Sequence, residues 1–266
     1  MTTRTATFAP YREVLPDGGL RLNFHWGQLK AWESRAREIL LLSGTQGGKS
    51  CFAIDWLLRE IRERGEGDYG LVTASFPLLT QKLLPEFLEV FQRLFQLGEW
   101  EASKNLFTFH GGATRVIVGT AQNPESLESG TWKGAVFDEA GQKQVRREAR
   151  EAILRRTAIH SGRILYPTTP YQLGWLKAEL VDRAREPGSG IEVISFPSWA
   201  NPAFPMEEAE RAKRVLPPWK YSMFYEGRFE RPVGMVYDCF SEDDVVRRFP
   251  VPDSWPVYVG HDFGTA

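Results

Sequence analysis

The sequence predicts a protein of the α/β class, built on a mainly parallel central sheet flanked by helices. Two observations predict this class. Short apolar runs alternate with amphipathic helical stretches between residues 38 and 194, which is the pattern of parallel strands joined by helices. One run leads into a glycine-rich loop and then a helix, and another ends in two adjacent carboxylates. The ends of such strands are where α/β proteins place their functional sites.

Composition limits the classes to which the chain can belong. Of its 266 residues, 42% are hydrophobic and 25% are charged, which allows a substantial core in one or two domains. No apolar run is long enough to span a bilayer, and residues 1–19 lack the apolar stretch of a signal peptide. The only cysteines are Cys51 and Cys239, which favours a reducing cytoplasm over a disulfide scaffold. With a net charge of −1, any contact with nucleic acid depends on a local cluster.

The first elements follow from turn residues and apolar spacing. Residues 1–22 are rich in proline, glycine and polar residues and are expected to form an N-terminal arm. A short helix around Trp26 should follow. The apolar run 38–42 predicts a buried parallel strand, and the spacing after it predicts a helix over 49–64 that ends at Gly65.

The later elements continue the alternation of strands and helices. Residues 70–74 predict a second buried strand, and residues 77–95 a long amphipathic helix that is interrupted or restarted at Pro85. The apolar segments 106–109 and 115–118 predict a β-hairpin. Further strands are expected at 134–138, 163–166 and 191–194, with a charged helix over 141–157, a helix between the last two strands, and helices near 206–214 and 217–226.

The segment 43–50 has the composition of a phosphate-binding loop, or Walker A motif. It follows a predicted strand and opens a predicted helix, as the motif requires. Its glycines let backbone N–H groups turn toward phosphates, and the helix N-terminus adds partial positive charge. Lys49 is expected to reach the β- and γ-phosphates of ATP, and the Ser50 hydroxyl to ligate Mg²⁺. The expected nucleotide-binding residues are Ser43, Gly44, Thr45, Gln46, Gly47, Gly48, Lys49 and Ser50, with serine where the strict motif has its first glycine.

The strand that ends at Asp138-Glu139 supplies the acidic half of such a site, the Walker B motif. An apolar strand that ends in two carboxylates is the partner that a phosphate-binding loop requires. Asp138 is expected to hold Mg²⁺ through water, and Glu139 to polarise the attacking water as general base. Together with the loop, this pair predicts a RecA-like (ASCE) P-loop ATPase that uses ATP and Mg²⁺.

The order of these features resembles the ATPase domain of the large terminase subunit of tailed bacteriophages, the motor that packages DNA into proheads. The resemblance lies in four stretches: Phe24-His25-Trp26-Gly27-Gln28, the loop at 43–50, Phe137-Asp138-Glu139-Ala140, and Tyr166-Pro167-Thr168-Thr169-Pro170 followed by Gly174-Trp175. Phosphate loops of that family commonly depart from the strict glycine pattern. The resemblance implies that Gln28 recognises adenine. It also implies that Thr168 or Thr169 senses the γ-phosphate and passes its loss to the neighbouring segment.

The C-terminal region extends the resemblance. The segments 225–229 and 233–237 are similar to the part of the terminase that joins motor and nuclease. The segment 258–264 is similar to the first strand of an RNase H-like nuclease, in which Asp262 is a metal ligand. The resemblance therefore implies a motor domain cut from a longer protein, with nuclease activity only at full length. The expected domains are an arm at 1–22, an ATPase core at 23–200, a helical lid or linker at 201–250, and the start of the nuclease at 251–266.

An arginine that acts on the γ-phosphate of a neighbouring subunit has no counterpart at the place that the family suggests. The stretch 126–133, before the acidic strand, contains no arginine. The nearest substitutes are Lys133 and the arginines of the following helix. We expect Arg146 or Arg147 to act as this arginine. The alternative is a solvated helix face whose arginines pair with nearby glutamates.

The resemblance also implies partners and a location. These are double-stranded DNA, further copies of the chain in a ring, the portal protein and the small terminase subunit, in the cytoplasm of an infected bacterium and without membrane contact. We expect the isolated chain to be a monomer. Three other functions stay open: a helicase, which needs a second RecA-like domain; a small-molecule P-loop kinase, which needs an arginine-rich lid; and a nucleotide-dependent scaffold without turnover, against which Glu139 argues.

Overall fold

The structure is a computed structural model that describes residues 9–127 and 130–231, together with residues 252, 254–256 and 260. The chain divides into two compact units, Met1–Gly234 and Met235–Ala266, and the helices and strands of the described residues lie in the first. Asp262 and most of the predicted nuclease strand lie outside the described residues, as does the segment 233–237. The domain boundaries expected from the sequence therefore stay predictions.

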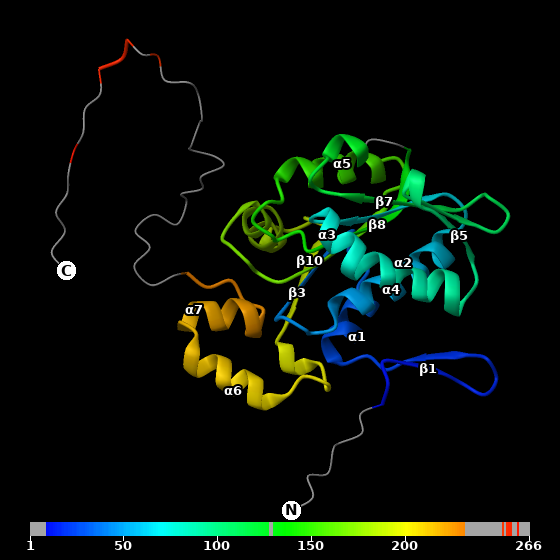
Figure 1. The fold of residues 1–266 in the computed structure, drawn as a ribbon, viewed down its shortest axis with the longest axis horizontal. Coiled ribbons are helices and arrows are strands. Elements are labelled where there is room, and N and C mark those ends of the chain that lie inside the picture. Colours follow the sequence, from blue (N-terminus) through cyan, green and yellow to red (C-terminus); the bar gives the residue numbers. More distant parts are fainter. Residues whose placement is uncertain (1–8, 128–129, 232–251, 253, 257–259, 261–266) are drawn as a thin grey trace, which may run out of the picture. The chain divides into compact units, whose positions relative to one another are not determined.

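A β-sheet forms the centre of this unit (Figure 1). It has eight strands, in the order β10-β3-β9-β8-β4-β7-β6-β5. Neighbouring strands from β10 to β7 are parallel, whereas β7, β6 and β5 pair antiparallel. The predicted α/β class with a mainly parallel sheet is confirmed. The strands are β3 (Glu38–Ser43), β4 (Asp68–Thr73), β5 (Gly98–Glu101), β6 (Leu106–Phe109), β7 (Arg115–Thr120), β8 (Trp132–Asp138), β9 (Arg163–Thr168) and β10 (Ile191–Phe196).

Helices cover both faces of the sheet (Figure 1). The side chains of α2 and of the helical run after β4 pack into one core cluster, and those of α5 and η5 pack into a second. In the described part of the chain, no helix is both long and apolar enough to cross a membrane. The helices of this region are α1 (Trp26–Glu33), α2 (Lys49–Arg64), α3 (Phe76–Leu78), η1 (Leu79–Leu83), α4 (Leu84–Leu88), η2 (Glu89–Leu94), η3 (Ala102–Lys104), η4 (Pro124–Leu127), α5 (Arg147–Thr157), η5 (Lys177–Asp182) and η6 (Arg183–Arg185).

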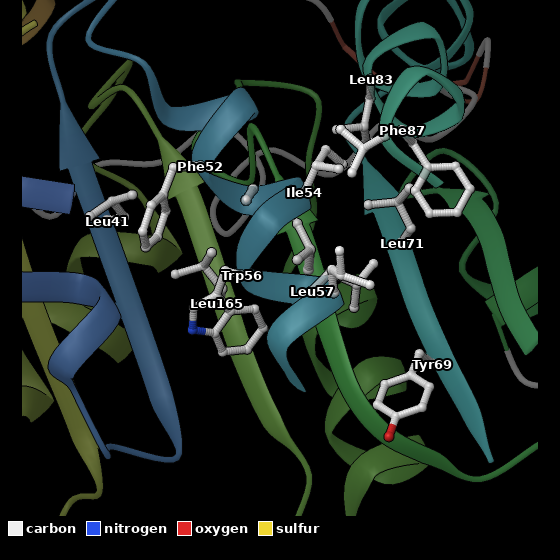
Figure 2. Close-up of a cluster of buried hydrophobic side chains, with 14 of the residues drawn as sticks. Leu41, Phe52, Ile54, Trp56, Leu57, Tyr69, Leu71, Leu83, Phe87 and Leu165 are labelled. Carbon is white, nitrogen blue, oxygen red and sulfur yellow. The ribbon is translucent and has the colours of Figure 1, made fainter. Parts of the chain in front are cut away.

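Strand β3 shows why a central parallel strand is apolar along its whole length. Ile39 and Leu41 belong to the cluster that includes α2, and Leu40 and Leu42 belong to the cluster that includes α5. Successive side chains of a strand point to opposite faces, so a sheet covered on both faces needs apolar residues at every position. Figure 2 shows the first cluster, in which side chains of α2 pack against the sheet strands beside them.

The segment after β4 is the expected long helix and restarts at Pro85 as predicted, but it does so through a π-helical turn that the sequence did not indicate. It is helical from Phe76 to Leu94, as α3, η1, α4 and η2 in succession. The Leu84 N–H donates to the Leu79 carbonyl, five residues back, at the end of the π-helical turn η1. Pro85 falls in the first turn of α4, where its missing N–H costs little. The π turn therefore lets the helical run continue past the proline.

Three further elements differ from the sequence expectation. The helix expected over 141–157 begins only at Arg147, because residues 139–146 form consecutive turns that start at the left-handed residue Glu139, φ +56°. Strand β5 was not predicted. The N-terminal arm contains a two-stranded antiparallel sheet, β1 (Arg12–Val14) and β2 (Leu20–Leu22). Arg12 ties this hairpin to α2 through an ion pair with Asp55, at 3.0 Å.

The C-terminal part of the unit consists of short helices. The helices expected near 206–214 and 217–226 are present. They are preceded by a single 3₁₀ turn directly after β10. In order they are η7 (Ser198–Ala200), α6 (Met206–Val215), α7 (Pro218–Tyr221) and η8 (Ser222–Glu226).

A buried ion-pair network joins α5 to the beginning of β3. Arg150 donates to both carboxylate oxygens of Glu38, at 3.0 and 3.1 Å, and to Glu179 at 2.7 Å. The Tyr166 hydroxyl also donates to Glu38, at 2.7 Å. Arg150 therefore does not lie on a solvated face of α5, as the spacing of charges along this helix suggested.

Replacing Arg150 by Ala should lower the free energy of unfolding by about 3 kcal/mol, because it leaves the carboxylate of Glu38 buried without its cation. Urea denaturation of the two proteins measures this difference. Arg147→Ala, which removes an exposed arginine of the same helix, is the matched control and should change stability little. Equal effects of the two substitutions would contradict a structural role for the Arg150 network.

Candidate functional site

The residues expected to carry chemistry gather at the carboxyl edge of the sheet. β9 lies between β3 and β8, so the strand that ends in Asp138 is one strand removed from the strand that ends in Ser43. All three strands are parallel. Their carboxyl ends therefore meet at one edge, which brings the loop at 43–50, the acidic pair and the threonines at the end of β9 together.

The loop between β3 and α2 is a tight turn with left-handed residues. Gln46 and Gly48 adopt positive φ angles of 57° and 82°. Glycine adopts this left-handed conformation more readily than other residues, which favours glycine at position 48. A side chain at Gly47 would place its Cβ 2.1 Å from the Ser43 hydroxyl. The loop leads directly into Lys49, the first residue of the 16-residue helix α2. The unpaired N–H groups at such a helix N-terminus favour a bound phosphate.

Lys49 lies inside the loop. Its ammonium donates to the carbonyls of Ser43 and Gly44, at 3.3 and 3.0 Å, and to the Thr169 hydroxyl at 3.1 Å. Burial lowers its pKa to about 8, and the charge of Lys82 adds to this effect, against the opposing charges of Glu139 and Asp138. An ammonium that burial has partly destabilised gains most from an anionic ligand.

Asp138 presents a buried carboxylate without a partner. Only 1% of the residue is exposed, and neither carboxylate oxygen accepts a hydrogen bond from the described residues. Burial, and then the neighbouring charge of Glu139, raise the pKa of Asp138 to about 7. Buried carboxylates are normally paired or bound to a metal, so these orphaned oxygens fit a bound cation.

Magnesium suits this donor set better than a metal that needs a protein cage. The described residues contain no group of three or more His, Cys, Asp or Glu that could hold a metal. Mg²⁺ is usually held by one or two carboxylates, with phosphate oxygens and water completing its shell. Asp138 supplies a carboxylate of this kind. Ser50, at the start of α2, can supply a hydroxyl oxygen as a further ligand.

Glu139 is held at both carboxylate oxygens. Lys82 of η1 donates to Oε1 and the Tyr171 hydroxyl donates to Oε2, each at 3.1 Å. The backbone of Glu139 is left-handed, and its N–H donates to the Pro167 carbonyl at 2.8 Å. Sequence reasoning did not find Lys82 or Tyr171. A polar residue so close to Thr168-Thr169 was a signal for Tyr171, whereas nothing in the local pattern pointed to Lys82.

Thr168, the last residue of β9, and Thr169, which follows it, have different contacts. Thr169 accepts the hydrogen bond from Lys49. Thr168 accepts from the Gly141 N–H at 3.0 Å and donates to the Thr169 carbonyl at 3.1 Å. Thr169 therefore touches the phosphate loop, and Thr168 ties the end of β9 to the turn that follows Glu139. The sequence left the choice between these two residues open.

Gln28 lies against the phosphate loop. Its side-chain nitrogen donates to the Gly48 carbonyl at 3.0 Å, and its oxygen accepts from the His25 N–H at 3.2 Å. The His25 ring lies 3.1 Å from the Gly47 carbonyl, a contact that was not foreseen. Gln28 is thus part of the wall behind the loop, and its recognition of adenine stays a prediction.

The C-terminal helices also hold the loop, which the sequence did not indicate. The Thr45 N–H donates to the Phe224 carbonyl of η8 at 2.6 Å. Ser198 donates to the Thr45 carbonyl at 2.6 Å, and Asn201 to the Gln46 carbonyl at 2.8 Å. Contacts between residues about 150 positions apart carry no short-range sequence signal, so pattern reasoning could not find them.

The expected trans-acting arginines lie on the surface at the start of α5. Arg147 pairs with Glu151 at 2.8 Å and with Glu179 at 3.3 Å. No ion pair involves Arg146 among the described residues. Lys133, the other candidate, lies near the beginning of β8, away from the carboxyl edge, and donates to the Arg64 carbonyl at 3.2 Å. Of these residues, only Arg146 and Arg147 follow the acidic strand end.

Comparisons with known proteins identify the fold. No protein-family profile matches the chain, and no curated protein matches it. Among solved structures, it is similar to the large terminase ATPase domain of Thermus phage P74-26, with 19% identity and a TM-score of 0.62. It is also similar to the large terminase of a thermophilic bacteriophage, solved in complex with ADP, with 17% identity and a TM-score of 0.68. The HK97 bacteriophage large terminase gives 13% identity and a TM-score of 0.63.

These similarities show that the chain has the RecA-like P-loop ATPase fold. More specifically, the chain has the fold of the ATPase domain of phage large terminases. The match covers 79% of this chain and 95% of the P74-26 domain. It covers 86% and 81% of this chain for the other two proteins, but only 60% and 53% of those longer terminases. The chain therefore spans a little more than half the length of those two terminases.

Proposed function

We propose that this chain is the ATPase motor of a phage large terminase, which hydrolyses ATP to drive double-stranded DNA into a prohead. The observation that carries the proposal is the unpartnered carboxylate of Asp138 beside Glu139. Both lie at the same sheet edge as Lys49 of the phosphate loop. The fold of terminase ATPase domains supports it. The terminase of the thermophilic bacteriophage has been solved with ADP and with ATP-γ-S, which supports a nucleotide as ligand.

The phosphate loop binds the phosphates of ATP in this proposal. Backbone N–H groups of the loop and the N-terminus of α2 face the phosphates, and Lys49 exchanges its carbonyl partners for phosphate oxygens. Asp138 and Ser50 would hold Mg²⁺, which would neutralise charge on the phosphates. Gln28 contributes to the adenine side of the site.

Glu139 is the general base. Its carboxylate accepts a proton from the water that attacks the γ-phosphorus, and the bond to the bridging oxygen of ADP breaks. Thr169 touches Lys49 and is therefore placed to sense loss of the γ-phosphate. Thr168 passes that change to the turn after Glu139 through its bond to the Gly141 N–H.

The affinity for nucleotide should depend on pH through Lys49. Its pKa of about 8 in the free protein rises when it pairs with phosphate, so binding takes up a proton above pH 8. We expect the affinity for ATP-γ-S to fall about fivefold between pH 8 and pH 9, a range over which Asp138, with a pKa of about 7, is already ionised. Titration calorimetry at these pH values measures it. A Lys49→Arg variant that still binds should show little of this dependence, and a pH-independent affinity of the wild type would contradict the assignment.

Arg146 or Arg147 supplies the arginine that acts on a neighbouring subunit, and the two ion pairs of Arg147 favour Arg146. If Arg146 acts in trans in a ring, adding Arg146→Ala protein to wild type should lower ATPase activity more than dilution predicts, because each inactive interface disables a wild-type site. Arg147→Ala is the matched comparison. A strictly proportional decrease for both variants would show that neither residue acts across an interface.

The wider assignment follows from the same proposal. The motor works as a ring of copies of this chain on double-stranded DNA, with the portal protein and the small terminase subunit, in the cytoplasm of an infected bacterium. In a full-length protein, Asp262 contributes a metal ligand to a nuclease. Contacts with phosphates rather than bases suit a motor that must move along any sequence.

Displacement of a third strand from a DNA triplex tests translocation. A motor that moves along double-stranded DNA should remove the third strand when ATP is present, and should fail to do so with ATP-γ-S or with Glu139→Gln protein. Displacement that requires a single-stranded loading site, or separation of the duplex itself, would favour a helicase. ATP hydrolysis without any displacement by the full-length protein with its portal would contradict the motor assignment.

A further inference from the structure

The carboxylate of Glu139 accepts hydrogen bonds from two separate segments of the chain. Lys82 comes from η1, after β4, and Tyr171 comes from the segment between β9 and η5. Each occupies a different carboxylate oxygen, at 3.1 Å. A carboxylate with only one such bond can rotate about its terminal torsion, whereas two bonds from independent elements fix the plane of the group.

The backbone at Lys82 is held in place by the packing of its neighbours. Leu79 and Leu83 of the same turn are 2% and 0% exposed and belong to the core cluster over this face of the sheet. The backbone of η1 is therefore anchored, and only the flexible stem of Lys82 reaches the carboxyl edge. The side chain of Lys82 is 43% exposed, while that of Glu139 is 6% exposed, so the ammonium approaches Glu139 from the solvent side.

Of the described cations near Glu139, the Lys82 ammonium is the one whose hydrogen bond goes to this carboxylate. Asp138 and Glu139 are adjacent carboxylates in a buried site, and Lys49 is hydrogen-bonded to two loop carbonyls and Thr169. Among the described residues, Lys82 is the cation that is hydrogen-bonded to Glu139. An exposed surface pair is worth little, but here the partner is the group proposed to act as general base.

We propose that Lys82 is a positioning residue for ATP hydrolysis, which holds the Glu139 carboxylate in the orientation from which it accepts the proton of the attacking water. Tyr171 sets the second oxygen. The inference rests on the proposed function, because it assigns Glu139 to a water that attacks the γ-phosphate. Each carboxylate oxygen can accept more than one hydrogen bond, so Glu139 can accept a hydrogen bond from that water while it is bonded to Lys82 and Tyr171.

The proposal makes a specific kinetic prediction. Lys82→Met should lower kcat about 10- to 100-fold, since a misplaced catalytic group costs up to about this much. KM and the Kd for ATP-γ-S should stay within about threefold of wild type, because Lys82 contacts the base rather than the loop. Lys82→Arg should recover most of the lost rate, since its guanidinium also donates to a carboxylate. Tyr171→Phe should have a smaller effect than Lys82→Met.

A double substitution separates positioning from a general structural effect. In the Glu139→Gln background, Lys82→Met should lower kcat no further, because residues that act as a unit are not additive. Lys104→Met is the matched control: Lys104 is also ion-paired, to Glu101 at 2.9 Å, but at the far edge of the sheet. It should leave kcat unchanged. Should Lys82→Met protein not fold, Lys82→Gln provides the same test.

The outcomes distinguish a failure of the positioning role from a failure of the proposed function. A wild-type kcat in Lys82→Met, a loss confined to ATP-γ-S binding, or additive effects of Lys82→Met and Glu139→Gln would each overturn the positioning role while leaving ATP hydrolysis intact. Undiminished hydrolysis by Glu139→Gln, or no hydrolysis by wild type, would instead contradict the proposed function and the positioning role together.

Discussion

Replacing Glu139 by Gln should lower the rate of ATP hydrolysis about 10²- to 10⁴-fold, the range that removal of a general base produces. Glutamine keeps the shape of the side chain but accepts a proton poorly. The phosphate loop is unchanged, so the affinity for ATP-γ-S should stay within about threefold of wild type. Release of inorganic phosphate and a parallel binding titration measure the two quantities.

The control for this substitution is Glu101→Gln, which makes the same chemical change in an exposed residue at the far edge of the sheet. It should hydrolyse ATP at the wild-type rate. Turnover by Glu139→Gln at the wild-type rate would remove Glu139 from the chemistry. The candidates for the base would then have to come from outside the acidic strand end.

Lys49→Ala should raise the Kd for ATP-γ-S about 100-fold or more. The ammonium is buried within the loop and hydrogen-bonds to the carbonyls of Ser43 and Gly44. Its removal takes away the charged donor of the proposed phosphate site, and hydrogen bonds to charged groups contribute about 1.5–3 kcal/mol each. Titration calorimetry with ATP-γ-S measures the loss.

The fold of Lys49→Ala should survive, because burial of an ammonium is costly in the free protein and alanine removes that cost. Thermal unfolding in the absence of nucleotide checks this point. Lys104→Ala serves as the binding control. An affinity close to wild type in a folded Lys49→Ala protein would exclude the loop at 43–50 as the phosphate site.

Much of the fold could be predicted because its signals are local. The apolar run of β3 predicts a strand covered on both faces, and Ile39 and Leu40 do belong to opposite core clusters. The loop at 43–50 and the pair at 138–139 are each contiguous in sequence. The order of the strands then brings these two segments to one edge, since parallel strands place all their carboxyl ends together.

The parts that could not be predicted depend on contacts distant in sequence. Lys82 pairs with Glu139 across 57 positions, and Arg150 pairs with Glu38 across 112. A spacing rule along α5 could not separate the buried Arg150 from the exposed Arg147, because both lie in the same charged stretch. The difference is decided by which residue faces β3.

The helical run restarts at Pro85, as the sequence predicts, but the geometry of the junction could not be predicted. A proline inside an apolar helical pattern predicts an interruption or a new start, and α4 starts at Leu84 directly after a π-helical turn. The π turn before α4 supplies a backbone geometry in which the Leu84 N–H bonds five residues back. Helix-period rules assume bonds four residues back and so do not include this geometry.

The most direct test of the ATPase assignment is a turnover experiment with Mg²⁺ and ATP in water enriched in ¹⁸O. If Glu139 directs water at the γ-phosphorus, the products should be ADP and inorganic phosphate that carries one solvent oxygen, and Glu139→Gln should form neither at a comparable rate. Phosphate found on another acceptor, or no ADP from wild-type protein that binds ATP-γ-S, would contradict it.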